Sequence, residues 1–280
     1  MLVVTQPDRP AGRGRVLAST PVKRAAAELD IATIEPQKMR DALETLRSLA
    51  VDLYAVASYG KIVPQAILDL PPLGALNVHP SLLPQYRGAT PLQSQLRDGV
   101  RLGGVTIIAM DVGMDTGDIV LQAERPIGPD ETYGELHDRF ADLGAELLGQ
   151  ACALVRDGRA KRTPQDGLDD PARVAATLTR PLRKEDLSVD WTEPAGRVYD
   201  RIRSLAPRPG ARGALDGEVS VVKILEARIA RDASAVENGE LAVLCGDGEM
   251  IVIERLIPPN RPAMTGRAFL AAKSTRGAAR

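Results

Sequence analysis

The chain contains 280 residues, of which 44% are apolar and 26% charged, and its formal net charge is −1. This length can bury one large core or two smaller ones, and the near-neutral charge argues against a protein that coats nucleic acid nonspecifically. No secretory signal and no apolar run of about 18 residues is present, and only Cys152 and Cys245 occur, so a cytoplasmic protein without disulfides, membrane span or zinc site is expected.

The first half of the chain alternates short apolar runs with helical patterns. The runs predict strands at 52–57, 74–79, 103–110 and 118–127, and the patterns predict helices at 21–29, 40–49 and 133–156. Thr132 and Glu135 form a capping-box pattern at the start of the last helix. Alternating strands and helices predict an α/β domain with a mostly parallel sheet.

The composition of the sequence changes after Gly158. Residues 158–188 are rich in charge and proline without periodicity, which predicts a linker. Short β-like runs follow at 219–225, 240–245 and 250–257, separated by the turn signals Asp216-Gly217, Asn238-Gly239 and Asp247-Gly248. Such spacing predicts a small antiparallel barrel or sandwich. The expected organisation is a catalytic domain at 1–157, a linker at 158–188 and a barrel at 189–275.

Polar residues gather at the ends of two predicted strands. Residues 76–91 read LNVHPSLLPQYRGATP, and strand alternation places Asn77 and His79 on one face. The next strand is followed by MDVGMDTGD, with Asp111, Asp115 and Asp118 among glycines. Because ligands of open α/β sheets bind beyond strand ends, an amide, an imidazole and a carboxylate are expected to meet there.

Such a set suits acyl transfer to an amine. An Asn amide or a protonated His can stabilise an oxyanion, and a carboxylate can orient the imidazole and help move a proton. No serine or cysteine stands in a nucleophile motif. The pattern alone leaves three alternatives open: a structural histidine, a solvated loop, or a divalent-cation site at the aspartates. His137, on the capped helix, is predicted to be a surface residue.

The motifs NVHPSLLP, MDVGMDTGD and SYGKIVP (58–64), in this order and spacing, resemble those of the folate-dependent formyltransferases, and most closely of their methionyl-tRNA branch. The resemblance runs from residue 1 to about residue 270, and it implies a Rossmann-like doubly wound domain followed by an OB-like barrel. It implies that Asn77, His79 and Asp115 are catalytic. It implies that 10-formyltetrahydrofolate is the formyl donor, that no metal is needed, that the Leu83–Pro84 peptide is cis, and that the folate contacts Ser81, Leu82, Leu83 and Pro84.

A second resemblance concerns the acceptor. Residues 5–15, TQPDRPAGRGR, are similar to the loop with which these enzymes engage the acceptor stem of initiator methionyl-tRNA. Arg9, Arg13 and Arg15 are expected to contact phosphates or base edges there. The barrel at 189–275 is expected to bind tRNA as well, and the protein is expected to be a monomer.

The sequence departs from the family pattern at two places. Family members begin with a strand, a loop and a helix before the strand that here is 1–5, so the sequence is expected to be truncated at its N-terminus. Residues 204–210, SLAPRPG, lack the aromatic-rich turn of the family. Two alternatives therefore stay open: formylation of a small amine, such as a nucleotide sugar or glycinamide ribonucleotide, and an inactive remnant that binds tRNA.

Overall fold

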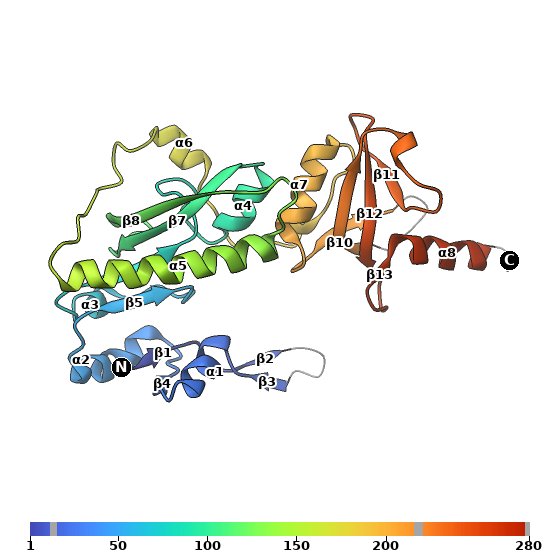
Figure 1. Cartoon of the computed structure of the whole chain (residues 1–280). Coiled ribbons are helices and arrows are strands. Elements are labelled where there is room, and N and C mark those ends of the chain that lie inside the picture. Colours follow the sequence, from blue (N-terminus) through green and yellow to red (C-terminus); the bar gives the residue numbers. More distant parts are fainter. Residues whose placement is uncertain (12–15, 216–220, 278–280) are drawn as a thin grey trace. The chain divides into compact units, whose positions relative to one another are not determined.

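The computed structural model describes residues 1–11, 16–215 and 221–277. Its chain forms two units, and each is built from several stretches of sequence (Figure 1). We call the first the amino-terminal unit, which comprises Met1–His79, Thr106–Gln122 and Gly144–Leu168. The second, the carboxy-terminal unit, comprises Pro80–Val105, Ala123–Leu143 and Asp169–Arg280. No helix among the described residues is both long and apolar enough to cross a membrane.

The first residues of the amino-terminal unit form a small layer of two parallel strands, β1 (Val3–Val4) and β4 (Thr33–Ile34). The adjoining helices are α1 (Pro21–Glu28) and α2 (Leu43–Leu49), preceded by the 3-10 turn Met39–Ala42. The Thr20 hydroxyl caps α1 by accepting a hydrogen bond from the Lys23 backbone, and Pro21 suits the first helical position. Both helices confirm the predictions for 21–29 and 40–49.

The main sheet has the strand order β5-β6-β7-β8. Its strands are β5 (Tyr54–Ala57), β6 (Ala75–His79), β7 (Leu102–Ala109) and β8 (Ile119–Pro126), which confirm the four predicted strands. The short helix α3 (Gln65–Leu68) lies between the first two in sequence. β5 and β6 are parallel, as expected, whereas β6 and β7 are antiparallel, with His79 opposite Thr106. The fold class is confirmed, and the sheet is mixed because the chain reverses between β6 and β7.

The long helix α5 (Tyr133–Arg156) matches the range predicted for it. The Thr132 hydroxyl accepts a hydrogen bond from the Glu135 backbone, and Glu135 accepts one in return from the Thr132 backbone at 2.9 Å. This reciprocal pair satisfies donors that would otherwise be unpaired at the helix start. The apolar side chains Leu136, Phe140, Leu143 and Leu147 of this helix are buried.

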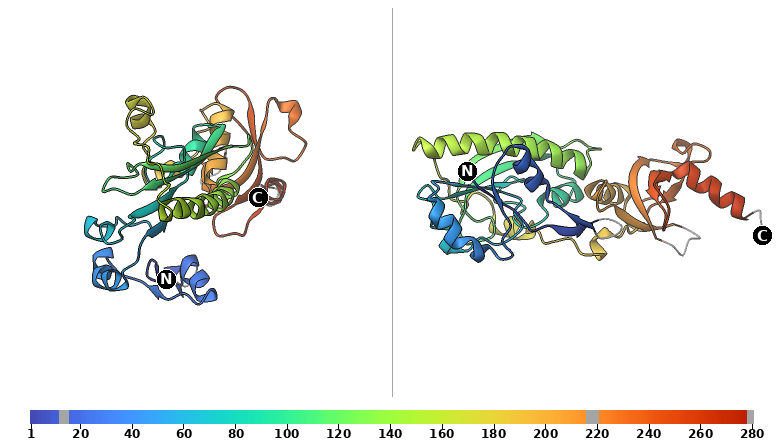
Figure 2. Two further views of the ribbon diagram at one scale, coloured as in Figure 1. Left: turned by 60° about the vertical axis from the view of Figure 1, so that its left-hand side comes forward. Right: turned by 90° about the horizontal axis from the view of Figure 1, so that it is seen from below.

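The carboxy-terminal unit contains an antiparallel sheet with the order β11-β12-β10-β9, to which β13 adds beside β12. The strands are β9 (Ala211–Ala214), β10 (Val221–Ala230), β11 (Ala242–Leu244), β12 (Met250–Ile257) and β13 (Met264–Thr265), orange to red in Figure 2. A register shift between Ile224 and Ala227 in β10 marks a bulge, a feature that bends and twists a strand. Helix α8 (Gly266–Gly277) follows the last strand. The sequence predicted a small antiparallel barrel or sandwich here, and the structure confirms an antiparallel sheet that curls into a half-barrel.

Helices α4 (Pro91–Arg97) and α7 (Ala195–Leu205) pack against each other in the same unit. Helix α7 also packs on β10, and its buried side chains Val198 and Ile202 join Ile224, Ile251 and Ile253 in one apolar core. Burial of this amphipathic face holds α7 in place, because a helix of this length gains most of its stability from packing.

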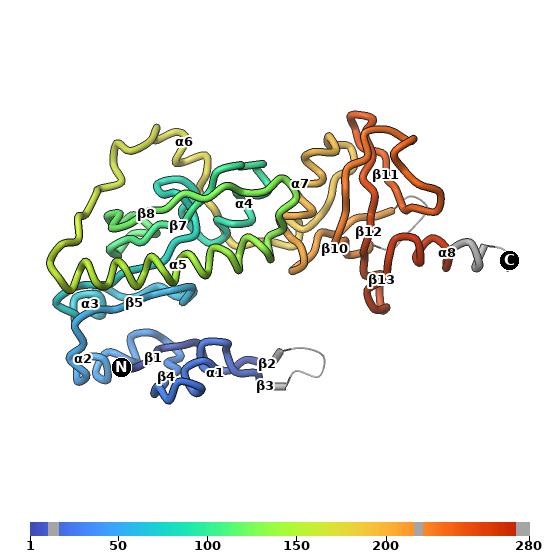
Figure 3. The backbone as a smooth tube through the Cα atoms, in the orientation of Figure 1, coloured from blue at the N-terminus to red at the C-terminus, as the bar shows by residue number. Residues whose placement is uncertain are grey.

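The segment predicted as a linker, 158–188, carries its own structure (Figure 3). It contains α6 (Pro171–Ala176) and the 3-10 turn Glu185–Leu187. Its residues 169–180 lie along residues 85–90: the Thr179 backbone donates to the Arg87 carbonyl at 2.8 Å, and Gln85 donates to Asp169 at 2.6 Å. At Gly88, whose φ is +110°, a side chain would collide with the Thr179 carbonyl. Residues 169–188 are therefore an ordered part of the carboxy-terminal unit, whereas residues 158–168 belong to the amino-terminal unit.

Candidate active site

His79 and Asp115 lie together in the amino-terminal unit. His79 is the last residue of β6, and Asp115 belongs to the loop that joins β7 to β8. The Nδ1 atom of His79 lies 3.5 Å from the Oδ2 atom of Asp115, an ion-pair distance. The His79 side chain is 4% exposed and that of Asp115 is 17% exposed. A carboxylate at this distance can fix the orientation of the imidazole ring.

Asn77 lies two residues before His79 on β6, opposite Ile108 of β7. Successive strand side chains point to opposite faces, so Asn77 and His79 share a face of the sheet. Asn77 is half-buried, whereas His79 is buried. The structure thus brings together two of the three predicted catalytic residues and places the third at the adjacent position on the same strand face.

The loop that carries Asp115 is held in an uncommon backbone conformation. Asp115 has a φ of +57°, in the left-handed region that non-glycine residues other than Asn and Asp rarely adopt. Asp111 stabilises the loop from within, because its carboxylate accepts hydrogen bonds from the Gly113 backbone and the Thr116 hydroxyl. Gly117 is required by space, since an added Cβ would lie 1.9 Å from the Ala109 carbonyl oxygen.

Gln165 also supports this loop, a role that was not predicted from the sequence. Its side chain is buried, and its amide donates hydrogen bonds to the carbonyl oxygens of Asp115 at 2.9 Å and Gly117 at 2.7 Å. Gln165 belongs to the segment predicted as a linker. No local pattern could have revealed its role, because the role depends on a contact with residues distant in the sequence.

The predicted folate segment, residues 81–84, follows His79 and Pro80 in the chain and belongs to the carboxy-terminal unit. Ser81 is fully buried, and its hydroxyl donates to the Gln85 carbonyl at 2.7 Å. Leu83 and Pro84 are buried, Leu82 is half-buried, and the Leu83–Pro84 peptide is cis as predicted. The Gln95 amide of α4 donates to the Pro80 carbonyl and ties the start of this segment to the helix. Contact between these four residues and a folate stays a prediction.

The predicted tRNA loop is a hairpin, β2 (Arg9–Ala11) paired antiparallel with β3 (Val16–Ala18). Arg9 is exposed at its base, whereas Arg13 and Arg15 lie outside the described residues. The base is anchored by Lys23, which bridges Asp8 at 3.1 Å and Glu35 at 2.7 Å. Hydrogen bonds to Glu35 and Asp8 raise the pKa of Lys23, so the bridge keeps its charge at neutral pH.

The structure also shows where His137 and the aspartates considered as cation ligands lie. His137 lies on the surface of α5 with 53% of its side chain exposed, which confirms the prediction. Asp111, one of the aspartates considered as a cation ligand, directs its carboxylate to Gly113 and Thr116 of its own loop. Among the residues that the structure describes, no three His, Cys, Asp or Glu side chains are grouped as metal ligands would be.

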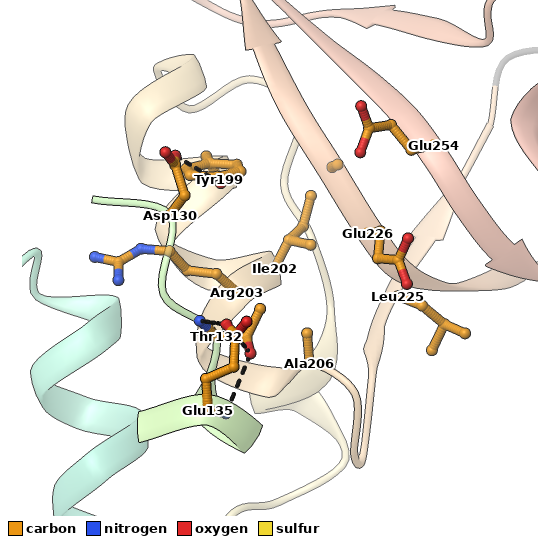
Figure 4. Close-up of a pocket in the computed structure, with 11 residues that line it drawn as sticks. Asp130, Thr132, Glu135, Tyr199, Ile202, Arg203, Ala206, Leu225, Glu226 and Glu254 are labelled. Atoms are coloured by element: carbon orange, nitrogen blue, oxygen red, sulfur yellow. Dashed lines mark hydrogen bonds between the residues drawn. The ribbon is translucent and has the colours of Figure 1, made fainter. Parts of the chain in front are cut away.

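A cavity of about 220 Å³ lies elsewhere, within the carboxy-terminal unit (Figure 4). Carboxylates from Asp130, Glu135, Glu226 and Glu254 line it. Tyr199 donates a hydrogen bond to Asp130 at 2.9 Å, and burial together with this bond raises the pKa of Tyr199. The lining also includes Arg203, whose guanidinium pairs with Asp200 at 2.6 Å.

Two family models match the chain. The model described as formyl transferase matches residues 1–152, and the model described as formyl transferase, C-terminal domain, matches residues 181–274. Among solved structures, an N-formyltransferase from Helicobacter canadensis in complex with folinic acid and dTDP-3-aminofucose has a TM-score of 0.64 at 16% identity, covering 89% of this chain and 86% of that one. HypX from Aquifex aeolicus in complex with tetrahydrofolic acid has a TM-score of 0.63 at 18% identity, covering 88% of this chain and 43% of that one. These two likenesses confirm the fold.

Sequence relatives are much nearer. The methionyl-tRNA formyltransferase of Syntrophus aciditrophicus is 43% identical over 279 residues, which cover 96% of this chain and 86% of the relative. That of Anaeromyxobacter dehalogenans strain 2CP-C is 45% identical over 275 residues, which cover 94% of this chain and 86% of the relative. With both family models matched in order and identity at this level over nearly its whole length, the chain belongs to the formyl transferase family, and within it to the methionyl-tRNA formyltransferases.

Proposed function

We propose that this protein transfers a formyl group from 10-formyltetrahydrofolate to the amino group of methionine esterified to initiator tRNA, in preparation for translation initiation. The observation that carries the proposal is the pair formed by His79, the last residue of β6, and Asp115 of the β7–β8 loop, 3.5 Å apart, within a chain more than 40% identical to methionyl-tRNA formyltransferases. The protein acts in the cytoplasm and as a monomer.

Formyl transfer to an amine needs a neutral nucleophile and a stabilised tetrahedral intermediate. A free α-amino group has a pKa of about 7.7–8.0, so an appreciable fraction is neutral near pH 7. The amine attacks the formyl carbon, and the carbonyl oxygen becomes an oxyanion. The Asn77 amide and the protonated His79 imidazole donate hydrogen bonds to that oxyanion. Collapse of the intermediate breaks the bond from the formyl carbon to the folate nitrogen and releases tetrahydrofolate.

Asp115 has two roles in this proposal. Its carboxylate faces Nδ1 of His79, so it orients the ring and keeps it protonated for the oxyanion. It also accepts the proton that the attacking amine loses, directly or through one water molecule, and that proton is returned to the leaving folate nitrogen. The carboxylate suits this exchange, because the Asp115 side chain is partly exposed whereas the imidazole is buried.

The substrates are assigned to separate segments. The reduced folate contacts Ser81, Leu82, Leu83 and Pro84. The buried Ser81 hydroxyl holds the turn by its hydrogen bond to the Gln85 carbonyl. Leu82 is more exposed than Leu83 and Pro84 and offers the folate an apolar surface. Arg9, Arg13 and Arg15 engage the acceptor stem through phosphate and base-edge contacts. The barrel at 189–275 supplies further tRNA contacts and the catalytic domain ends near residue 157.

A competition assay tests the proposal. The purified chain is given 10-formyltetrahydrofolate carrying a labelled formyl group, with charged initiator methionyl-tRNA, an amino sugar nucleotide and glycinamide ribonucleotide as acceptors. Label should appear on the methionyl-tRNA at the highest kcat/KM. Preferential labelling of either small amine would assign a different acceptor, and tRNA binding without transfer to any acceptor would identify a non-catalytic tRNA-binding protein.

A further inference from the structure

Gln165 packs against the loop that carries Asp115 and bonds its backbone. It is 4% exposed, and both hydrogens of its side-chain amide reach backbone carbonyls, those of Asp115 and Gly117. The two acceptors flank Thr116, so one amide spans the part of the loop in which Asp115 adopts its left-handed backbone. A side-chain amide offers two donors in a fixed plane, which suits two carbonyls on the same side of a turn.

The segment that carries Gln165 is itself fixed to the sheet. The backbone of Thr163 exchanges two hydrogen bonds with Ile119 at the start of β8, at 2.8 and 2.9 Å. Thr163 lies two residues before Gln165, and Ile119 lies two residues after Gly117. The backbone next to Gln165 is therefore hydrogen-bonded to β8, the strand that follows the Asp115 loop. This pairing fixes the position of the Gln165 side chain relative to Asp115.

The loop is supported from two directions. Asp111 holds Gly113 and Thr116 from the side of β7, and Gln165 holds the carbonyls of Asp115 and Gly117 from the side of β8. Because the carboxylate of Asp115 reaches the His79 imidazole only when its backbone keeps this conformation, a rotation of one peptide would move the carboxylate away. A misplacement of about 1 Å can lower turnover on the order of 100-fold.

We propose that Gln165 is a positioning residue for formyl transfer: its amide locks the backbone of Asp115 so that the carboxylate stays on the His79 imidazole. The inference rests on the proposed roles of His79 and Asp115. Gln165 touches neither substrate in this account, and it acts through the direction of the Asp115 side chain.

A double-mutant cycle separates positioning from general stability. Gln165→Ala should lower kcat by about 10-fold, with the KM values for folate and tRNA within about twofold, because the substrates do not contact this residue. In an Asp115→Asn background, the same Gln165→Ala change should lower kcat by less than about twofold, because the carboxylate that Gln165 orients is already gone. Equal effects in the two backgrounds would overturn the inference.

Two further variants complete the experiment. Gln165→Met fills the same space without donors, so it should lose as much kcat as Gln165→Ala; recovery of normal turnover by Gln165→Met would assign Gln165 a space-filling role instead. Gln150→Ala removes an exposed glutamine of α5 that donates a hydrogen bond to Glu146, and it should keep wild-type turnover. If Asp115→Asn alone keeps full activity, the catalytic proposal fails, and this outcome is distinct from a failure of the Gln165 inference.

Discussion

His79, the last residue of β6, presents its Nδ1 atom at 3.5 Å to the Oδ2 atom of Asp115, which belongs to the loop between β7 and β8. The imidazole is buried and the carboxylate is partly exposed, so the pair has one side fixed in the sheet and one side open to exchange protons. In the proposed mechanism, this pair supplies the acid–base chemistry that formyl transfer needs.

Replacement of His79 should remove the charged donor from the oxyanion. His79→Asn is expected to lower kcat for methionyl-tRNA formylation by about 100-fold or more, the usual effect of losing such a donor. The matched control is His137→Asn, since His137 is the other histidine and lies on the surface of α5. Steady-state formylation assays of both variants check the prediction, and equal activity of the two would remove His79 from the mechanism.

Gly117→Ala should damage both stability and activity. The added Cβ would lie 1.9 Å from the Ala109 carbonyl, so the loop must move, at a cost of about 1–3 kcal/mol in the free energy of unfolding. Gly149→Ala is the control, because nothing lies within 4 Å of its Cβ position and alanine is favoured by about 1 kcal/mol inside a helix. Urea denaturation and turnover are measured together. A stable and fully active Gly117→Ala protein would contradict the tight packing of the loop.

Arg13→Ala should weaken tRNA binding without changing the chemistry. The KM for methionyl-tRNA is expected to rise while kcat stays the same. The slope of log(kcat/KM) against log[salt] should become shallower by about 1, the contribution of one phosphate contact. Arg47→Ala serves as the control, since Arg47 is an exposed helix residue paired with Glu44. Assays over a range of salt concentrations check this, and an unchanged KM would show that the loop does not touch tRNA.

Asp186 should contribute a pH-dependent part of stability. Hydrogen bonds from Arg180 and from the Arg183 backbone lower the pKa of Asp186 to about 2. A depressed pKa stabilises the folded state above the unfolded value of about 3.9, and this contribution is lost as the pH falls through about 2. Because Arg180 is half-exposed, Asp186→Asn should cost only about 1 kcal/mol at pH 7. Urea titrations at pH 7 and pH 3 should show a smaller difference from wild type at pH 3; a constant difference would contradict this account.

Much of the site could be predicted because its residues follow local rules. Asn77 and His79 lie two residues apart at the end of an apolar run. Strand periodicity places them on one face, and this does not depend on the rest of the fold. Asp115 could be named from its glycine-rich loop and the family motif. The capping box at Thr132 and Glu135 likewise sets the start of α5 by short-range contacts alone.

What the sequence did not predict depends on long-range contacts. The antiparallel pairing of β6 with β7 is a property of the chain path between them, and strand composition does not encode direction. Residues 158–188 have little periodicity because their order comes from contacts elsewhere: Thr163 with Ile119, Gln165 with the Asp115 loop, and Thr179 with Arg87. Composition indicated a linker, whereas partners distant in sequence fix its structure.

The most direct test of the central claim is a single-turnover measurement with Asp115→Asn. Asparagine tolerates the left-handed backbone of Asp115 as well as aspartate does, so the substitution removes the charge and leaves the loop in place. With enzyme in excess over methionyl-tRNA and with saturating 10-formyltetrahydrofolate, the first-order rate of formyl-methionyl-tRNA formation should fall at least about 100-fold, while the Kd for folate stays within about twofold. A variant that formylates at the wild-type rate would show that the carboxylate beside His79 takes no part in the reaction.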